Sequence, residues 1–442
     1  MSNFSIGILS FCIMLGLLAV RVPIGVAMFA VGAGGFIYIS GLTPLLAFLK
    51  STPFEAFSNY SFSVIPLFLL MGNVASRSGL SARLFKGASA ILGHHRGGMA
   101  MASVGACAAF GTICGSSLAT AATMGQVALP EMKKYGYSGA LSTASLAAGG
   151  TLGILVPPSV PLVIYAILAQ QNIAKLFLAA FIPAALAIFG FFCAIRYFVW
   201  ANPGSGPATP KRPFSERLKD IIATWPVVSI FLIVFVGMNG DFFVGSSLFT
   251  PTEGAAVGAL CATLAAIFIG KARLREIFAS VRSTGEQTGM IFLILLGAEM
   301  YNAFLARTNM PQIMAEWVAA LGFSPYLIMV VIVAIYILLG CLMDSLSMLL
   351  LTIPIFFPVV MGLDFGMSAE HTAIWFGILA LIVVELGLIH PPVGLNVYVI
   401  STIAKDVPMM ETFRGILPFL AVEFVRVGLI IAFPILTLAL IK

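Results

Sequence analysis

Two proline pairs stand at matching places in the two halves of this 442-residue sequence. The first half reads LGILVPP over 152–158 and the second reads LGLIHPP over 386–392, so both contain the pattern L-G-x-[IL]-x-P-P. Proline has no amide hydrogen and its ring clashes with the preceding turn, so each pair predicts a broken helix. Carbonyl groups freed at such a break can bind a cation, and the helix beyond it presents free N–H groups to an anion.

The residues around these breaks are candidate ligands for a hard cation such as Na⁺, through their backbone carbonyl groups. The candidates are Gly153, Val156 and Pro158 in the first half, with Gly387, His390 and Pro392 as their counterparts in the second. His390 could ligate a cation, titrate or cap a helix end. The alternative for both pairs is an ordinary proline kink.

Polar residues also interrupt two other apolar stretches. Ser116 and Ser117 offer hydroxyl and carbonyl oxygens, and Asp344 is the only acidic or basic residue between Glu316 and Asp364. An acid inside a membrane segment is costly and usually functional, although Asp344 could instead cap a helix at a turn. Both roles are compatible. Candidate substrate contacts near these points are Thr151, Ser345 and Asn396.

The composition requires that lipid solvates most of the chain. The sequence is 60% hydrophobic and 9% charged, with a mean hydropathy of +1.08, whereas soluble domains contain about 25% charged residues. The six cysteines lie in apolar segments without a CxxC pair, so we expect buried packing thiols and neither a disulfide framework nor a metal site. In the last apolar segment, Glu423 and Arg426 are three residues apart and placed to pair.

Ten apolar segments are long enough to predict membrane crossings, which need about 20 residues each. They lie at roughly 4–20, 22–41, 57–77, 138–170, 173–201, 221–240, 249–270, 283–305, 371–404 and 412–440. Two further stretches, 99–135 and 324–361, do not fit as single spans. No charged residue separates Arg96 from Glu131, and one helix of that length would measure about 51 Å at ~1.5 Å per residue. We predict a re-entrant helical hairpin at each stretch, with its turn at the small and polar residues.

Three basic segments fix the expected orientation. They lie at 77–96, 202–220 and 271–282, and each contains four arginine or lysine residues. If the first hairpin returns to its own side, an even number of crossings separates these segments, and all three fall on one side. The positive-inside rule makes that side cytoplasmic and both termini periplasmic.

The same count predicts an inverted repeat. Residues 1–201 form the first repeat, 202–220 a cytoplasmic linker and 221–442 the second repeat, each repeat with five crossings and one hairpin. Because five is odd, the second repeat is inverted relative to the first, and the two hairpins enter from opposite faces. Inverted repeats are a common plan of secondary transporters. We therefore expect an all-α polytopic transporter whose hairpin tips meet the two proline breaks near the middle of the membrane.

At these motifs the sequence resembles the large membrane subunit of tripartite ATP-independent periplasmic (TRAP) transporters, of the DctM or SiaM type. The matching stretches are IPLFLLMGNVASRSG (65–79), GSSLAT (115–120), GTLGILVPPSVPLVIY (150–165), GCLMDSLSMLLLTIP (340–354) and GLIHPPVGLN (387–396). They occur in the family's order and extend over nearly the whole chain. One departure is His390, because the family commonly has threonine before the second proline pair.

The resemblance implies Na⁺-coupled import of organic acids across the bacterial inner membrane by an elevator motion, with two or more Na⁺ ions and no organic cofactor. Two partners are implied: a small four-helix membrane subunit (DctQ-like) and a periplasmic substrate-binding protein (DctP-like). By analogy the family's cation sites map onto Ser116, Ser117, Gly153, Val156, Pro158, Gly340, Gly387, His390 and Asp344. A backbone ligand would survive the change to His390, whereas a threonine hydroxyl ligand would not.

Two other functional classes compete with this interpretation. A stand-alone Na⁺/dicarboxylate symporter would share the broken helices but need no binding protein, and an ion channel would need a continuous conducting path. A membrane-embedded enzyme fits least, because the sequence has no GxSxG, phosphate-loop or HExxH motif.

Overall fold

The structure is a computed structural model that describes residues 3–240, 247–320, 322–341 and 343–441. Within these residues all regular structure is helical, which confirms the all-α class. Five of the described helices are long and apolar enough to cross a membrane: α10 (Ile173–Ala201), α14 (Pro251–Phe268), α15 (Leu274–Thr308), α19 (Ala369–Ile389) and α21 (Met409–Ala432). Three bent helix pairs raise this number to eight if each pair is one span.

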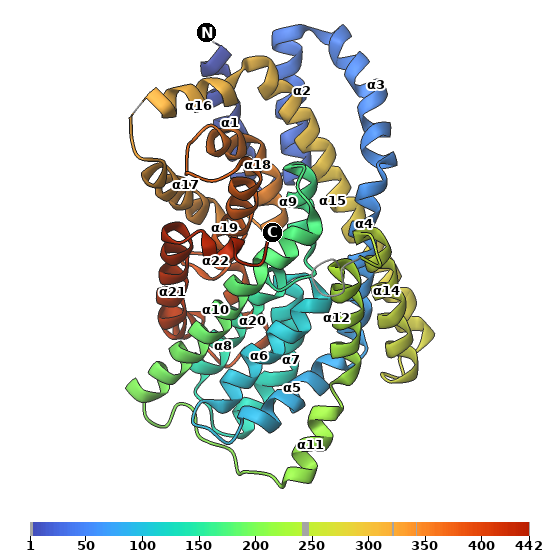
Figure 1. The fold of residues 1–442 in the computed structure, drawn as a ribbon, viewed down its shortest axis with the longest axis vertical. Coiled ribbons are helices and arrows are strands. Elements are labelled where there is room, and N and C mark those ends of the chain that lie inside the picture. The colour runs from blue at the N-terminus through green and yellow to red at the C-terminus, as the bar shows by residue number, and fades with distance from the viewer. Residues whose placement is uncertain (1–2, 241–246, 321, 342, 442) are drawn as a thin grey trace.

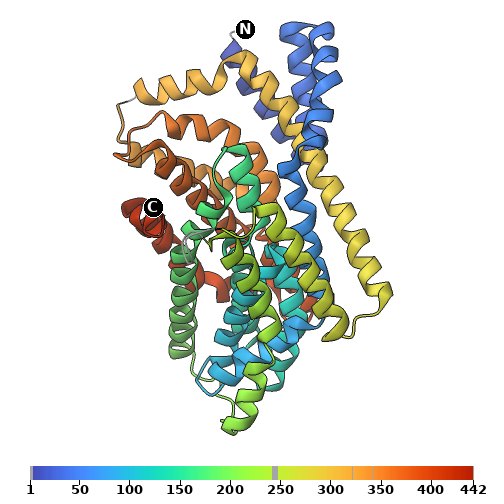
Figure 2. The same cartoon turned by 45° about the vertical axis from the view of Figure 1, so that its right-hand side comes forward.

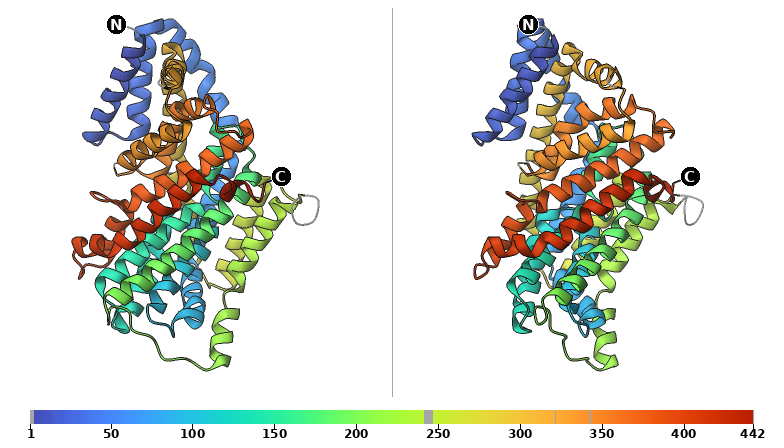
Figure 3. Two further views of the ribbon diagram at one scale, coloured as in Figure 1. Left: turned by 60° about the vertical axis from the view of Figure 1, so that its left-hand side comes forward. Right: turned by 90° about the vertical axis from the view of Figure 1, so that its left-hand side faces the viewer.

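The first three helices stand at one end of the molecule, and a fourth continues towards its middle (Figures 1 and 3). They are α1 (Asn3–Ala19), α2 (Ile24–Ser40), α3 (Leu42–Ser58), the 3₁₀ turn η1 (Tyr60–Ser63) and α4 (Val64–Arg77). The first two match predicted crossings, and η1 with α4 matches the segment expected at 57–77. Helix α3 was not expected, because Lys50, Pro53 and Glu55 interrupt its apolar pattern. In Figure 2, α2 and α3 rise beside α15, and α2 packs along α15.

The first proline break lies in a run of closely packed helices. They are α5 (Leu80–Leu92), α6 (Gly98–Cys114), α7 (Ser117–Lys134), α8 (Gly139–Leu155) and α9 (Val160–Leu168), followed by α10. Helices α6 and α7 occupy the stretch 99–135 and meet at a short turn. Helices α8 and α9 are bent by 43° at the proline pair, and the Pro157–Pro158 peptide bond is cis.

The helices after the linker follow one another in an order similar to that of the first half. They are α11 (Phe214–Ile222), α12 (Trp225–Met238), α14, α15, α16 (Met310–Ala320), α17 (Pro325–Gly340), α18 (Ser345–Met361), α19, α20 (Leu395–Ile403), α21 and α22 (Ile435–Leu438). A helix, a short helix, a helical hairpin, a broken helix and a long helix therefore occur in this order in both halves. The short helices α5 and α16 each follow a left-handed residue, Gly79 (φ 71°) and Asn309 (φ 52°). The bond Pro391–Pro392 is also cis.

The three basic segments lie together, as a shared side of the membrane requires. Arg83 Nη2 donates to the Ile269 carbonyl at 3.1 Å, which joins the first segment to the residues just before the third. Arg217 Nε donates to the Ala90 carbonyl at 2.7 Å, which joins the linker to the first. Most of 271–282 is not a loop but the first turns of α15. Figure 1 places α11 at the opposite end of the molecule from the N-terminus.

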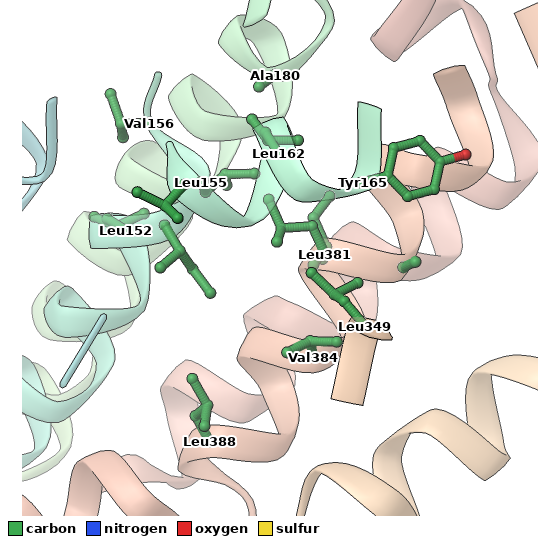
Figure 4. Close-up of a cluster of buried hydrophobic side chains, with 14 of the residues drawn as sticks. Leu152, Leu155, Val156, Leu162, Tyr165, Ala180, Leu349, Leu381, Val384 and Leu388 are labelled. Atoms are coloured by element: carbon green, nitrogen blue, oxygen red, sulfur yellow. The ribbon is translucent and has the colours of Figure 1, made fainter. Parts of the chain in front are cut away.

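The helices that flank one proline break pack on the hairpin of the other half. Helix α9 packs against α18 and α19, and α20 packs against α7 and α8. Figure 4 shows the apolar core that results, in which Leu155 and Leu162 from the first half lie close to Leu381 and Val384 from the second. Tyr165 also reaches across, because its hydroxyl donates to the Ala373 carbonyl. Neither half can bury its apolar surface without the other.

The cysteine expectation is only partly right. Cys107, Cys114 and Cys341 are buried, Cys261 is partly buried, and Cys12 and Cys193 are exposed. A thiol behaves as a small apolar group, and a helix face in contact with lipid accepts it as readily as a protein core does.

Candidate functional site

The first hairpin turns at Cys114, Gly115 and Ser116. Gly115 has φ 62°, a left-handed conformation that ends α6, and the side chain of Ser116 accepts a hydrogen bond from the Ala119 amide, which starts α7. A glycine C-cap followed by a serine N-cap reverses the chain in two residues. Both oxygens of Ser116 therefore take part in the start of α7, because its carbonyl accepts a hydrogen bond from the Thr120 amide at 3.0 Å.

This tip lies directly on the first proline break. A Cβ atom at Gly153 would come within 2.8 Å of the Ser116 carbonyl oxygen and 2.5 Å of the Thr120 hydroxyl oxygen. A Cβ atom at Gly111 would meet the Cα of Gly153 at 2.8 Å. Only glycine allows these backbones to approach so closely. The structure thus brings together Ser116 and Gly153, which were predicted as ligands.

The first break is buried and contains oxygen atoms that could coordinate a hard cation. Val156, Pro158 and Ser159 are buried, and because Pro157 and Pro158 have no amide hydrogen, the Gly153 and Ile154 carbonyls have no helical donor. The hydroxyl oxygens of Thr120 and Ser159 are buried without a hydrogen-bond partner among the described residues. Buried polar atoms without a partner are rare and costly. These carbonyl and hydroxyl oxygens suit Na⁺, which prefers oxygen ligands.

The second break repeats the glycine contact but differs in chemistry. A Cβ atom at Gly387 would lie 2.6 Å from the Cα of Gly340, so these two predicted residues are also in backbone contact. His390 and Pro391 are half-buried and Pro392 is exposed. The Nδ1 atom of His390 is within hydrogen-bond distance of the Pro391 carbonyl, and the Cys341 thiol lies 3.5 Å from the same carbonyl oxygen.

Of the three roles open to His390, the structure describes one: its backbone caps the end of α19, where its N–H donates to the Gly387 carbonyl at 3.4 Å. The ligand and titration roles stay predictions. The His390 ring lies edge-on to Phe424 and folds back onto its own chain. A carbonyl is an acceptor only, so Nδ1 is the protonated nitrogen in this contact. The Pro391 carbonyl is thereby occupied, and a cysteine thiol lies beside each break, because Cys114 Sγ is 3.9 Å from the Ser116 carbonyl oxygen at the first.

Asp344 has the helix-capping role. Its Oδ2 accepts hydrogen bonds from the amides of Leu346 at 3.2 Å and Ser347 at 3.3 Å, and its other oxygen accepts from the Ser347 hydroxyl. The carboxylate therefore starts α18 in the way that Ser116 starts α7. Leu342, in the turn before it, lies outside the described residues.

Both hairpin tips open into one cavity of about 420 Å³. Ser116, Ser117, Asp344 and Ser345 line it from the two tips, and Val160 with Pro161 lines it from the first turn of α9. The first turns of α7, α9 and α18 therefore converge on this cavity. The N-terminus of a helix has a partial positive charge and free N–H groups, which favour anions. Its lining, within the described residues, contains neither lysine nor arginine.

The sequence did not single out the opposite wall of this cavity. Leu69, Gly72 and Asn73 of α4 and Gln287 of α15 line it, and Asn73 Nδ2 donates to Gln287 Oε1 at 3.0 Å. A Cβ atom at Gly72 would come within 2.5 Å of the Cys114 carbonyl oxygen. Two amide side chains inside apolar segments are a usable signal, and Asn73 falls within the stretch that carries the family resemblance.

The three candidate substrate contacts have different positions. Ser345 lines the cavity. Asn396 is fully buried, and its Nδ2 donates to the Ser117 hydroxyl at 2.7 Å and to the Ala147 carbonyl at 3.2 Å. These bonds connect the first hairpin tip to α20 and α8. Thr151 is buried and its hydroxyl donates to the Ala148 carbonyl of its own helix. Neither Asn396 nor Thr151 is among the residues that line the cavity.

Comparison with known proteins agrees with this arrangement. Residues 11–436 match the family described as "Tripartite ATP-independent periplasmic transporter, DctM component". The chain is 34% identical over 389 residues to the C4-dicarboxylate TRAP transporter large permease protein DctM of Pseudomonas aeruginosa, covering 88% of this chain and 87% of that protein. It is 30% identical over 427 residues to the sialic acid TRAP transporter large permease protein SiaM of Vibrio cholerae, covering 96% of each.

A solved structure supports the fold. The crystal structure of the YdaH transporter of Alcanivorax borkumensis, described as having an unusual topology, matches with a TM-score of 0.60 over 88% of both chains. The two sequences are only 15% identical, so this likeness concerns the fold alone.

Proposed function

The chain belongs to the DctM family, the large permease component of TRAP transporters, and we propose that it imports organic carboxylates across the bacterial inner membrane, driven by Na⁺. The observation that carries this proposal is the cavity between the two hairpin tips, on which the first turns of α7, α9 and α18 converge. The partial positive charges at these three helix N-termini suit a carboxylate. The relatives named for a C4-dicarboxylate and for sialic acid, both carboxylates, agree with this substrate class.

We place one Na⁺ at the first proline break, between the hairpin tip and Gly153. Ser116, Ser117, Val156 and Pro158 supply hard oxygens there, and the partnerless Thr120 hydroxyl faces Gly153. Gly340, Gly387, His390 and Pro392 are the matching set in the second half, where the Cys341 thiol and the His390 ring compete for the Pro391 carbonyl. Asp344 adds negative charge at the second tip.

Replacing Asp344 by asparagine separates its two roles. Asparagine caps a helix as well as aspartate does, so folding should change little, but the negative charge is lost. We expect the Na⁺ concentration for half-maximal uptake to rise about tenfold, the size of one charge-assisted contact. Ser116→Ala should also weaken Na⁺ dependence. The measurement is uptake against Na⁺ concentration, with membrane insertion checked in parallel.

Asp344→Ala is the matched comparison, because it removes the charge and the cap together and should also destabilise the chain by about 1 kcal/mol. If Asp344→Asn and Ser116→Ala both retain the wild-type Na⁺ dependence, neither residue belongs to an ion site.

We further propose that 99–135 and 324–361 are re-entrant hairpins that move with the two broken helices in an elevator motion. Both tips line one cavity whose other wall comes from α4 and α15, so substrate would lie between a moving part and a fixed part. The basic segments would face the cytoplasm and both termini the periplasm. The partners would be a small four-helix membrane subunit and a periplasmic binding protein.

Dependence on the binding protein tests this function. The purified chain alone in proteoliposomes should not accumulate a labelled carboxylate under an inward Na⁺ gradient, and addition of the small subunit and the cognate binding protein should start accumulation. Delivery by a binding protein gives the cavity a high local substrate concentration that free solute does not reach. Robust uptake by the single chain would instead support a stand-alone symporter, and single-channel currents would support a channel.

A further inference from the structure

A second cavity, of about 670 Å³, lies at the end of α10 near the linker, away from the hairpin tips. His94, His95 and Arg96 line it from the turn between α5 and α6, and Arg196 lines it from α10. The remaining lining residues are Cys193, Tyr197, Val199, Trp200 and Ala208. Two arginines and two histidines thus surround one cavity, and the lining that the structure describes contains no acid.

The positive potential of this region extends beyond the cavity lining. Partial desolvation and the positive charges of His95, Arg217 and Lys211 lower the pKa of His94. The linker that carries Lys211 and Arg217 is fixed in place, because Thr209 N donates to the Gly93 carbonyl and Gly97 N donates to the Gly206 carbonyl. Arg96 and Arg196 are exposed and form no ion pair with any described residue. Their charges are available to a ligand.

The position of this cavity on α10 indicates a lipid rather than a soluble ion. Helices α10 and α21 run side by side on the outside of the bundle (Figure 3). Phe189 is 69% exposed, Tyr197 58% and Trp200 77%, and at spacings of eight and three residues they share the outer face of α10. An apolar stripe that ends in tyrosine, tryptophan and arginine is typical of the boundary between the hydrocarbon and headgroup layers.

We propose that this cavity binds the phosphate headgroup of an anionic phospholipid from the leaflet on the basic side of the membrane. Arg96 and Arg196 would contact the phosphate, since a guanidinium group matches phosphate oxygens in a two-pronged contact. Tyr197 and Trp200 would lie at the ester region, and the acyl chains would follow the stripe through Phe189. Basic pockets at the cytoplasmic ends of membrane helices bind anionic headgroups by this chemistry. The bound lipid would hold the linker against α10.

The test compares two charge-matched double variants of the full-length chain. Arg96→Gln with Arg196→Gln removes two positive charges from the cavity, and Arg273→Gln with Arg275→Gln removes two from the same face at the start of α15. Native mass spectrometry in detergent counts retained phosphatidylglycerol and phosphatidylcholine. We expect the wild type and the second variant to prefer phosphatidylglycerol by at least about tenfold, and the first to lose that preference.

Further measurements separate the alternatives. Phosphatidylglycerol should raise the unfolding temperature of the wild type and not that of the Arg96→Gln, Arg196→Gln variant, whereas inorganic phosphate should have no effect on either. Arg96→Lys with Arg196→Lys should restore the preference, since lysine also binds phosphate. Equal stabilisation by inorganic phosphate would mean a soluble-anion site, and equal retention of both lipids by all variants would overturn the proposal. Loss of lipid on addition of the small membrane subunit would also overturn it, because that surface would then be a protein interface.

Discussion

A single methyl group at Gly153 should reduce Na⁺-driven uptake by at least about tenfold, and the same change at Gly387 should have a similar effect. The Cβ of Gly153→Ala would lie 2.8 Å from the Ser116 carbonyl oxygen, and that of Gly387→Ala 2.6 Å from the Cα of Gly340. Both clashes are with backbone, which cannot rotate away as a side chain can. Each variant must therefore push a hairpin tip off its proline break, at a cost of about 1–3 kcal/mol.

The matched controls are two other glycines inside helices. A Cβ atom at Gly105 in α6 or at Gly428 in α21 would meet nothing within 4 Å, so Gly105→Ala and Gly428→Ala should each be neutral or stabilise the chain by about 0.5–1 kcal/mol. The measurements are initial uptake rates and the rise in unfolding temperature caused by Na⁺. Wild-type uptake and Na⁺ stabilisation in Gly153→Ala would show that the tip contact has no part in ion binding.

Elements with a strong local signal were predictable from sequence. The turns of both hairpins and both proline breaks fall where small residues or prolines interrupt long apolar runs, and α6, α7, α17 and α18 begin and end within a few residues of the predicted stretches. Helices α3, α5 and α16 were missed for a common reason. All three mix charged with apolar residues, and α5 and α16 are also short, so hydropathy does not mark them as spans.

The candidate site was predictable only in part. Ser116 and Gly153 lie on different helices, and the repeated motifs were enough to associate them. The amides of Asn73 and Gln287 meet across 214 residues, and Asn396 reaches Ser117 across 279. Such contacts depend on helix orientation and register, which periodicity does not fix. The ring of His390 contacts a carbonyl one residue away and the Cys341 thiol at the end of α17, so residue type alone left its surroundings open.

A buried cluster of charges should control the stability of the fold. Arg426 of α21 lies within 3.5 Å of Glu385 of α19 and closer still to Glu423, and its Nη1 donates to the Pro183 carbonyl of α10 at 3.3 Å. The side chains of Arg426, Glu385 and Glu423 are at most 3% exposed. The pairing of Glu423 with Arg426 was expected from their spacing, whereas the approach of Glu385 was not.

Arg426→Met should therefore destabilise the chain by about 3–5 kcal/mol, the range observed when one partner of a buried ion pair is removed. Methionine has a similar length but leaves two acids without a cation inside the protein. Arg282→Met is the control, since Arg282 and Glu286 form an ion pair whose side chains are 83% and 65% exposed, and such pairs contribute at most about 1 kcal/mol. The measurement is the fraction of monodisperse protein that survives heating in detergent.

A charge-free version of the cluster decides why Arg426 matters. If the cost arises from uncompensated acids, the triple variant Glu385→Gln, Glu423→Gln, Arg426→Met should recover most of the stability lost in Arg426→Met, because neutral amides need no counter-ion. If the cost arises from lost packing and the lost bond to the Pro183 carbonyl, the triple variant should be as unstable as the single one. Because Glu385 lies two residues before Gly387 in α19, recovered stability with recovered uptake would assign the cluster a purely structural role. Recovered stability without uptake would mean that the charges also position the second proline break.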